Sequence, residues 1–246
     1  MVRWIRKVVR RSEILSGVAR AMRLLPRRLR RWRSLMLRSR KIRRYLASHA
    51  VRKVHLGAGP NALDGWLNTD YDPRRPGEIF LDVTKRFPFP SGSLDYIYTE
   101  HMIEHIAFDQ AWGMLRECYR VLRPGGRIRL ATPGLDALLE LYAPRRTEDQ
   151  DHYLKWIVDR YYPRAGLYGP CFALNGLFLL WGHQFVYDKT TLQHVLREAG
   201  FTDLVVCEIG QSDDAVLQHL ESHGSVIEDE TVSRLETIVV EGRRPA

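Results

Sequence analysis

The sequence predicts a doubly wound α/β fold with a mostly parallel sheet, and three observations support that prediction. Short apolar segments alternate with helical segments from about residue 53, as in parallel strands joined by crossovers. Polar or glycine residues follow these apolar segments in turn, at the positions where sheets of this class bind ligands. The chain of 246 residues is long enough for one large domain with a substantial core.

The predicted elements follow one another from residue 53 to residue 241. Strands are expected where short apolar runs lie between turn residues, at 53–57, 66–70, 78–83, 94–98, 127–132, 203–209 and 234–241. The last of these is expected to be antiparallel at the sheet edge. Helices are expected where apolar residues recur at helical spacing, at 108–122 and 189–199.

Local stop and start signals agree with the two helices. The first ends at Arg123-Pro124-Gly125-Gly126, which carries proline and glycine stop signals. The second begins after Asp188, a suitable N-cap, and ends at Gly200. The acidic segment 211–231 is expected to hold a surface helix at most.

The glycine turn after the first strand is the first candidate ligand site. Gly57 and Gly59 lack the Cβ atoms that would keep a ligand off the backbone, and Ala58 lies between them. Asp70 ends the next strand, where a carboxylate can accept hydrogen bonds from ribose hydroxyls. The connection to Leu67 is shorter than a normal crossover of roughly a dozen residues, so at most one irregular helical turn is expected there. The short spacing to Asp70 also argues against NAD, whose sites use about 20 residues.

The charge of the chain is divided between two regions. Residues 1–53 hold 19 Lys/Arg and one acidic residue, Glu13, which leaves 19 Lys/Arg and 28 Asp/Glu for the remainder. The first region therefore carries +18 and the second −9. This asymmetry predicts a basic arm, residues 1–50, on an acidic domain, residues 51–246. The three cysteines show neither metal nor disulfide spacing, so a reducing compartment is expected: Cys118, Cys171 and Cys207.

The basic arm is predicted to be amphipathic and helical. Its apolar residues, such as Leu15 and Trp32, recur at helical spacing with arginines on the other faces, and Pro26 divides it into two helices. An anionic membrane surface is the favoured partner of residues 1–50. A structural arm packed on the domain or on a partner subunit, a nucleic-acid-binding arm and a targeting segment are the alternatives. No apolar run reaches the length of a transmembrane helix.

Residues 134–182 differ from the rest of the domain because aromatic residues are frequent and the helical pattern is interrupted. They lie between the fifth strand and the last helix, where a cap could close over a substrate. Burial in the core is the alternative for most of these rings.

Three histidines, His101, His105 and His183, are the candidates for a general base, because histidine titrates near neutral pH. A helical turn would put His101 and His105 on one face. The alternatives are that His105 caps or packs the following helix and that His183 packs in a loop. The repeated Glu-His spacing also permits a metal site, but the sequence shows no further ligand cluster, so no metal is expected.

Taken in order, these motifs resemble the class I S-adenosylmethionine-dependent methyltransferases, and most closely a small bacterial group associated with glycan biosynthesis. The resemblance covers about residues 52–210. The matching segments are Leu56-Gly57-Ala58-Gly59-Pro60-Asn61, Gly65 to Asp70, Phe87-Pro88-Phe89-Pro90, Leu94 to His105, Arg120 to Gly126 and His183 to Phe201. The short first connection also fits this group.

The resemblance implies a Rossmann-like fold and a set of residues for the cofactor S-adenosyl-L-methionine. By that resemblance Gly57, Ala58 and Gly59 would pass against its methionyl end, and Asp70 would hold the ribose. Asp82 and Val83 would flank the adenine. Thr99, Glu100 and His101 would line the pocket under the sulfonium.

The leading hypothesis is therefore a transferase (EC 2.1.1.-) that methylates a small-molecule, saccharide or lipid-linked acceptor. Methyl transfer asks the protein mainly to align the nucleophile and to exclude water. The expected location is cytoplasmic, with peripheral membrane contact through residues 1–50 as an extension. The alternatives are a noncatalytic cofactor-binding module and an RNA methyltransferase recruited through the arm.

Overall fold

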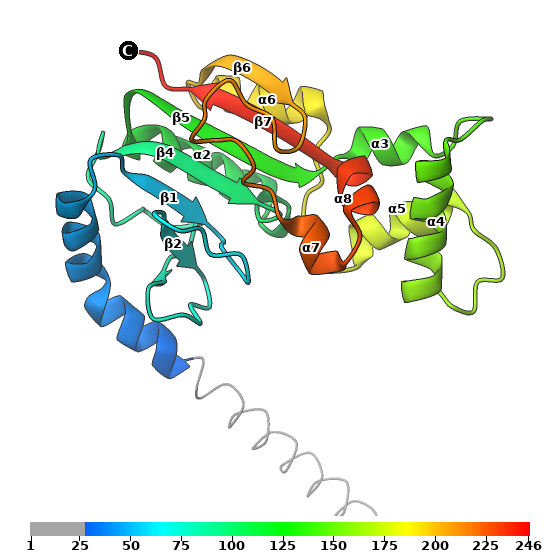
Figure 1. The fold of residues 1–246 in the computed structure, drawn as a ribbon, viewed down its shortest axis with the longest axis horizontal. Coiled ribbons are helices and arrows are strands. Elements are labelled where there is room, and N and C mark those ends of the chain that lie inside the picture. Colours follow the sequence, from blue (N-terminus) through cyan, green and yellow to red (C-terminus); the bar gives the residue numbers. More distant parts are fainter. Residues whose placement is uncertain (1–27) are drawn as a thin grey trace, which may run out of the picture.

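A seven-stranded sheet forms the centre of the computed structural model, which describes residues 28–246. The strand order is β3-β2-β1-β4-β5-β7-β6. The strands are β1 (Lys53–Leu56), β2 (Leu67–Asp70), β3 (Ile79–Phe80), β4 (Leu94–Glu100), β5 (Leu122–Pro133), β6 (Thr202–Cys207) and β7 (Thr237–Arg243). The first five pair in parallel, whereas β7 is antiparallel to both β5 and β6. The predicted doubly wound, Rossmann-like sheet with an antiparallel edge is confirmed, and the edge is the pair β7–β6 (Figure 1).

The two predicted helices pack on the sheet as amphipathic elements. Helix α2 (Phe108–Val121) buries Met114, Leu115 and Cys118, and α6 (Lys189–Glu198) buries Leu192 and Leu196. Both contribute to one core cluster with the apolar residues of β1, β4 and β5. The Asp188 side chain accepts a hydrogen bond from the Thr191 amide, at 2.6 Å, which confirms it as the N-cap of α6.

The predicted cap region forms a separate helical lobe beyond the carboxyl ends of the strands (Figure 1). Its helices are α3 (Leu135–Glu140), α4 (Glu148–Tyr161) and α5 (Pro170–Leu179). They share a second core with α8 (Glu230–Glu236), to which Leu154, Ile157 and Leu177 belong. We call these four helices the helical lobe. The short helix α7 (His223–Ile227) lies between the lobe and the sheet.

The described part of the basic arm is a helix over residues 28–48 that packs on the domain. Tyr45 is buried in the main core, and its hydroxyl donates to the Lys53 carbonyl at 2.8 Å. Ser34 accepts a hydrogen bond from the Phe80 amide at 2.7 Å. These contacts are those of a structural arm, one of the alternatives raised above. The predictions for Pro26 and the preceding residues lie outside the described part of the chain.

Within residues 28–246, no helix combines the length and the apolar character needed to cross a bilayer.

Three sequence predictions about strand and helix boundaries differ from the structure. The third strand stops at Phe80, because the chain then turns and Asp82 accepts hydrogen bonds from the Thr84 amide and hydroxyl. The last strand begins at Thr237, since the three residues before it complete α8. The acidic segment is not limited to a surface helix. It holds α7 and part of α8, and it buries Leu217 and Leu220 against Tyr98.

Candidate functional site

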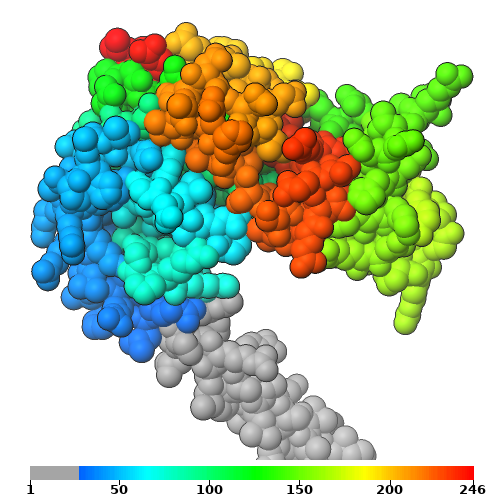
Figure 2. Space-filling view, viewed as in Figure 1, coloured from blue at the N-terminus to red at the C-terminus, as the bar shows by residue number. Residues whose placement is uncertain are grey.

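A cavity of about 400 Å³ lies at the carboxyl ends of β1, β4 and β5, between the sheet and the helical lobe. The glycine turn of residues 57–61 forms one wall, and Trp156, Tyr161 and Trp181 face it from the lobe. Histidines and glutamates lie at its base. Figure 2 shows the molecule notched between the segment around residues 54–75 and the lobe. The size suits a small-molecule site, and the mixture of aromatic and titratable side chains suits binding with chemistry.

The glycine turn has the backbone conformation that the sequence predicts. Gly57 and Gly59 have φ angles of +66° and +49°, in the region that favours glycine. A Cβ atom on Gly57 would lie 2.6 Å from Cγ of Met102, whereas the nearest atom to one on Gly59 is the Gly57 carbonyl oxygen at 3.9 Å. The turn is therefore packed from behind at Gly57 and open at Gly59. Ala58 is buried between them, and residues 57–66 form turns without a helix, as expected.

Asp70 is the last residue of β2 and Asp82 follows β3, on neighbouring parallel strands, and neither side chain lines the cavity. Oδ2 of Asp70 accepts a hydrogen bond from the Gly59 amide at 2.9 Å, and Oδ1 accepts from the Asp72 amide at 2.6 Å. Each oxygen keeps a second lone pair for a hydroxyl donor. The Thr84 contacts of Asp82 involve Oδ1 alone, and Val83 packs partly buried against the core. The turn and Asp70 thus form one unit.

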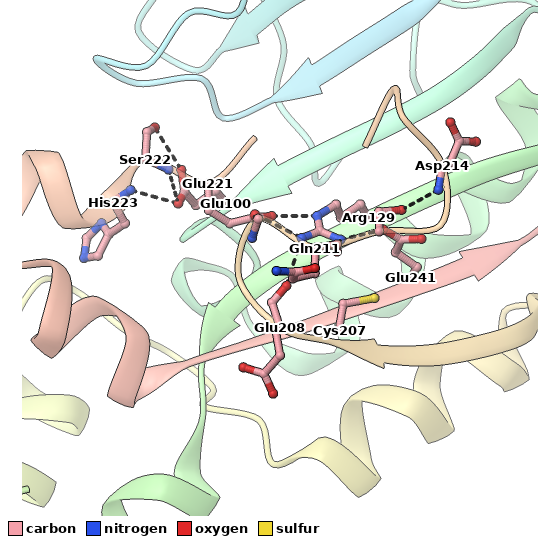
Figure 3. A network of polar contacts seen from close by, with 12 residues as sticks. Glu100, Arg129, Cys207, Glu208, Gln211, Asp214, Glu221, Ser222, His223 and Glu241 are labelled. Carbon is pink, nitrogen blue, oxygen red and sulfur yellow. Dashed lines mark hydrogen bonds and ion pairs between the residues drawn. The ribbon is translucent and has the colours of Figure 1, made fainter. Parts of the chain in front are cut away.

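The end of β4 reaches the cavity less directly than the resemblance implies. The Thr99 side chain is fully buried and does not line the cavity. Oε1 of Glu100 accepts hydrogen bonds from the amides of Ser222 and His223, both at 2.9 Å (Figure 3). Burial raises the pKa of Glu100, and the two amides only partly oppose that effect. Glu100 lines the cavity but holds the segment before α7 in place.

His101 has an uncommon conformation, with a φ angle of +45°. Its ring stacks on that of His223, with centroids 3.6 Å apart and planes at 17°. Burial alone would lower the pKa of His101, but the neighbouring Glu104, Glu236 and Glu100 outweigh it and raise that pKa. Burial, together with His101, lowers the pKa of His223 to about 3. Of the two stacked rings, His101 is therefore the one whose surroundings favour the protonated form.

Glu104 does not line the cavity but is buried directly behind His101 and His105, which do. Its side chain has no solvent exposure, and Oε2 accepts a hydrogen bond from the Thr132 hydroxyl at 3.0 Å. Burial would raise the pKa of Glu104, but His101 and His105 outweigh it and lower that pKa. Oε1 lies 3.4 Å from Nδ1 of His101 and 4.0 Å from Nε2 of His105. The carboxylate therefore joins the histidines into one cluster.

His105 and His183 meet across the cavity from different elements. His105 ends the short 3₁₀ turn Ile103–His105, and the N-cap of α2 is Ala107, so His105 does not cap that helix. Nδ1 of His183 lies 2.6 Å from the Leu177 carbonyl, to which it must donate because a carbonyl only accepts. Its Nε2 therefore carries the lone pair. Burial lowers the pKa of His183, which keeps the ring neutral.

The cavity brings together all three predicted histidines, the glycine turn and Glu100, whereas Asp70 reaches it only through its hydrogen bond to the Gly59 amide and Asp82 does not line it. Sequence reasoning missed Glu104, His223 and Glu236, and it assigned no lobe residue. Glu104 lay within the Glu-His repeat, so the signal was present. His223 lies in the acidic segment 211–231, which was expected to hold a surface helix at most, and Glu236 lies in the predicted last strand, so no local signal marked them.

Comparison with known proteins gives one family match. Residues 66–130 match a family model described as a methyltransferase domain (Methyltransf_11), which spans β2 to β5. That match supports a class I S-adenosylmethionine-dependent methyltransferase and, with it, S-adenosylmethionine as the cofactor. No curated protein matches the sequence.

Several solved structures resemble this chain at low identity. A putative methyltransferase in complex with the Trm112 activator, from Haloferax volcanii, is 15% identical with a TM-score of 0.44, over 87% of this chain and 94% of that one. An S-adenosylmethionine-dependent methyltransferase from Mesorhizobium loti is 18% identical with a TM-score of 0.47, over 79% and 91%. A possible histamine N-methyltransferase from Thermotoga maritima is 15% identical with a TM-score of 0.44, over 92% and 96%. Function is therefore argued from the site.

Proposed function

We propose that this chain is an S-adenosylmethionine-dependent methyltransferase that methylates an oxygen atom of a small-molecule or saccharide acceptor. The observation that carries the proposal is the joined unit of the open glycine turn and Asp70, which borders a cavity with titratable groups at its base. The methyltransferase-domain match includes Asp70 and supports the same cofactor.

The residues of the β1–β3 edge are suited to holding that cofactor. Gly59 leaves its backbone open to a ligand, Asp70 offers lone pairs to a ribose diol, and Asp82 follows at the next strand. When bound, S-adenosylmethionine supplies a methyl group activated by a sulfonium. The chain's own task is to align the acceptor and exclude water.

The acceptor enters between the aromatic side chains of the lobe and the histidine cluster. Trp156, Tyr161 and Trp181 offer flat apolar surfaces, and Arg160 adds a positive charge beside them. Among the predicted bases, His183 is the best suited, because its Nε2 lone pair is available and its ring is neutral. Its Nε2 accepts the proton of an acceptor hydroxyl when that oxygen attacks. A cavity of about 400 Å³ favours a small acceptor over a folded RNA.

The arm is proposed to place the enzyme at an anionic membrane surface, which would bring it to a lipid-linked acceptor. Leu29, Trp32 and Met36 are 61%, 60% and 67% exposed on the described arm helix, and arginines flank them. Such a surface suits peripheral binding at a cytoplasmic membrane face. Sedimentation with vesicles of anionic and of zwitterionic lipid tests this proposal. If the chain sediments with neither kind of vesicle, the proposal is contradicted.

Calorimetric titration of S-adenosylmethionine into the full chain tests the proposed function. Wild type is expected to bind at micromolar concentration and to ignore NAD. Asp70→Ala is expected to lose the binding, whereas Asp64→Ala, an exposed carboxylate near the same turn, is expected to keep it. A folded wild type that binds no S-adenosylmethionine would contradict the proposal.

A further inference from the structure

His105 and His183 line the cavity, and Glu104 is buried beside His105, with 4.0 Å between Oε1 and Nε2. These three side chains bring one ligand atom each to within 4.8 Å of one another. We propose that they bind a divalent transition-metal cation, which in turn binds the acceptor oxygen. Two imidazoles and one carboxylate are a ligand set used for Fe²⁺, Mn²⁺ and Zn²⁺ with open positions left for substrate. The inference deepens the proposed methyl transfer and rests on it for its role.

Glu104 provides the first argument, because one of its oxygens is buried and unsatisfied. Oε1 makes no hydrogen bond within residues 28–246 although the side chain has no solvent exposure, and its contact with Nδ1 of His101, at 3.4 Å, is an ion pair outside hydrogen-bonding geometry. A buried carboxylate oxygen without a hydrogen bond is costly, so a cation that reaches Oε1 would stabilise it. Oε2 is meanwhile held by the Thr132 hydroxyl at 3.0 Å, as outer partners orient the carboxylates of metal sites.

The two histidines provide the second argument, because their rings are placed as metal ligands are. The centroids of His105 and His183 are 5.0 Å apart and their planes meet at 71°, so the two rings can direct nitrogens toward one point. His183 donates Nδ1–H to the Leu177 carbonyl, which fixes the tautomer that leaves Nε2 as a ligand. Closing on a cation at bonds of about 2.0–2.2 Å needs small rotations of these partly exposed side chains.

A second triad, His101, His223 and Glu236, meets the same distance limit but is less suitable. The rings of His101 and His223 are stacked at 17° with centroids 3.6 Å apart. Because ring lone pairs lie in the ring planes, stacked rings direct them side by side and not toward one cation. His101 instead lies against Glu104 and keeps that carboxylate in place.

A cation at this site would change how the acceptor is activated. A hydroxyl bound to a divalent cation loses its proton more readily, as metal-bound water does. The proton passes to solvent, the acceptor oxygen bonds to the methyl carbon, and the electron pair of the carbon–sulfur bond leaves with sulfur. With the cation bound, Glu104, His105 and His183 act as its ligands, and the cation replaces Nε2 of His183 in the activation of the hydroxyl that was described above for the metal-free chain.

Metal binding by the full, tag-free chain tests the assignment after treatment with EDTA and dialysis. Calorimetric titration with MnCl₂ and visible absorption with CoCl₂ are expected to show one site per chain, and MgCl₂ is expected to bind poorly because it prefers oxygen ligands. His105→Ala and His183→Ala are expected to weaken Mn²⁺ binding by more than about 100-fold, beyond the usual loss for an outer partner. Thr132→Val is expected to weaken it by roughly 10- to 100-fold.

The controls separate this inference from folding and from the proposed function. His194→Ala, an exposed histidine on α6, and His223→Ala are expected to leave Mn²⁺ affinity unchanged. Retained S-adenosylmethionine binding shows that each variant is folded. Three results would overturn the inference: no Mn²⁺ binding by a wild type that binds S-adenosylmethionine, equal affinity in all variants, or a loss in His223→Ala as large as in His183→Ala. Metal binding without any S-adenosylmethionine binding would instead overturn the proposed function alone.

Discussion

Two buried ionic clusters lie along β5, one around Arg129 and one beside Thr132 near its carboxyl end, and they differ in how many of their polar atoms are hydrogen-bonded. Arg129, in the middle of the strand, has a fully buried guanidinium between Glu221 and Glu241 (Figure 3). It donates to both carboxylates and to the Gln211 carbonyl at 2.9 Å. Burial would lower the pKa of Arg129, but the two glutamates outweigh it and raise that pKa. Every guanidinium nitrogen of Arg129 has an acceptor, so we call this cluster closed.

The cluster at the end of the strand is open. Glu104 keeps one buried oxygen without a hydrogen-bond partner in the described residues, and His183 keeps a ring nitrogen with a lone pair. The two clusters contain similar residue types, so charge and burial do not separate them. They differ in whether their buried polar atoms have hydrogen-bond partners. A fully hydrogen-bonded network stabilises the fold, whereas a network with an unpaired polar atom beside a cavity can bind a ligand.

Breaking the closed cluster is expected to have the largest effect on stability. Arg129→Leu would leave Glu221 and Glu241 facing an apolar side chain, which typically costs about 3–5 kcal/mol of unfolding free energy. Urea denaturation measures it. The matched control is Arg146→Ala, whose exposed ion pair with Asp151 should contribute less than about 1 kcal/mol. Equal losses in the two variants would remove the distinction between closed and open clusters.

The two glycines of the turn differ in a similar way: Gly57 is packed against Met102, whereas Gly59 is open to a ligand. Gly57→Ala adds a Cβ 2.6 Å from Met102 and strains a positive φ angle, so a loss of about 2–4 kcal/mol is expected. Gly59→Ala strains φ without a close contact, and about 1–2 kcal/mol is expected. S-adenosylmethionine titration should show reduced affinity for Gly59→Ala despite its milder effect on folding. Unchanged affinity would place the cofactor away from the turn.

The N-cap of α6 gives the scale of a single charged hydrogen bond. Asp188→Ala is expected to cost about 1 kcal/mol, because the Thr191 amide loses its acceptor. That same amide lowers the pKa of Asp188 in the folded state. The contribution is therefore fully present above the unfolded pKa of about 4 and is lost as the pH falls through the lower folded value. Denaturation at pH 7 and at pH 2.5 should show a smaller difference between variant and wild type at the lower pH.

The smallest effect on stability is expected in the open cluster. The His105 side chain is 38% exposed, so His105→Ala should change unfolding free energy by no more than about 0.5 kcal/mol. Methyl transfer to any acceptor that is found should nevertheless fall by at least about 100-fold, within the usual range for an acid–base or metal-binding group. A large loss of stability with normal turnover would reverse the roles assigned to the two clusters.

Much of the fold follows from local patterns. The spacing of apolar residues determines α2 and α6, and the Asp188 cap and the glycine stops place their ends within a residue or so. The short connection after Gly59 and the carboxylate of Asp70 also follow from the sequence, because both lie within one supersecondary unit. The three histidines of the site also follow from the sequence, because their residue type and their place near strand ends predict a role in the site.

Only the tertiary structure decides which of these histidines can act and with which partners. The stacking of His101 on His223, the hydrogen bond of His183 to Leu177 and the burial of Glu104 all join segments that are distant in sequence. The acidic segment 211–231 shows this most clearly. Its composition predicts a solvated surface. Glu221 is nevertheless buried, because it pairs with the buried guanidinium of Arg129. His223, two residues later, lines the cavity as a result. Buried ion pairs between distant segments depend on the complete fold, so the local sequence does not predict them.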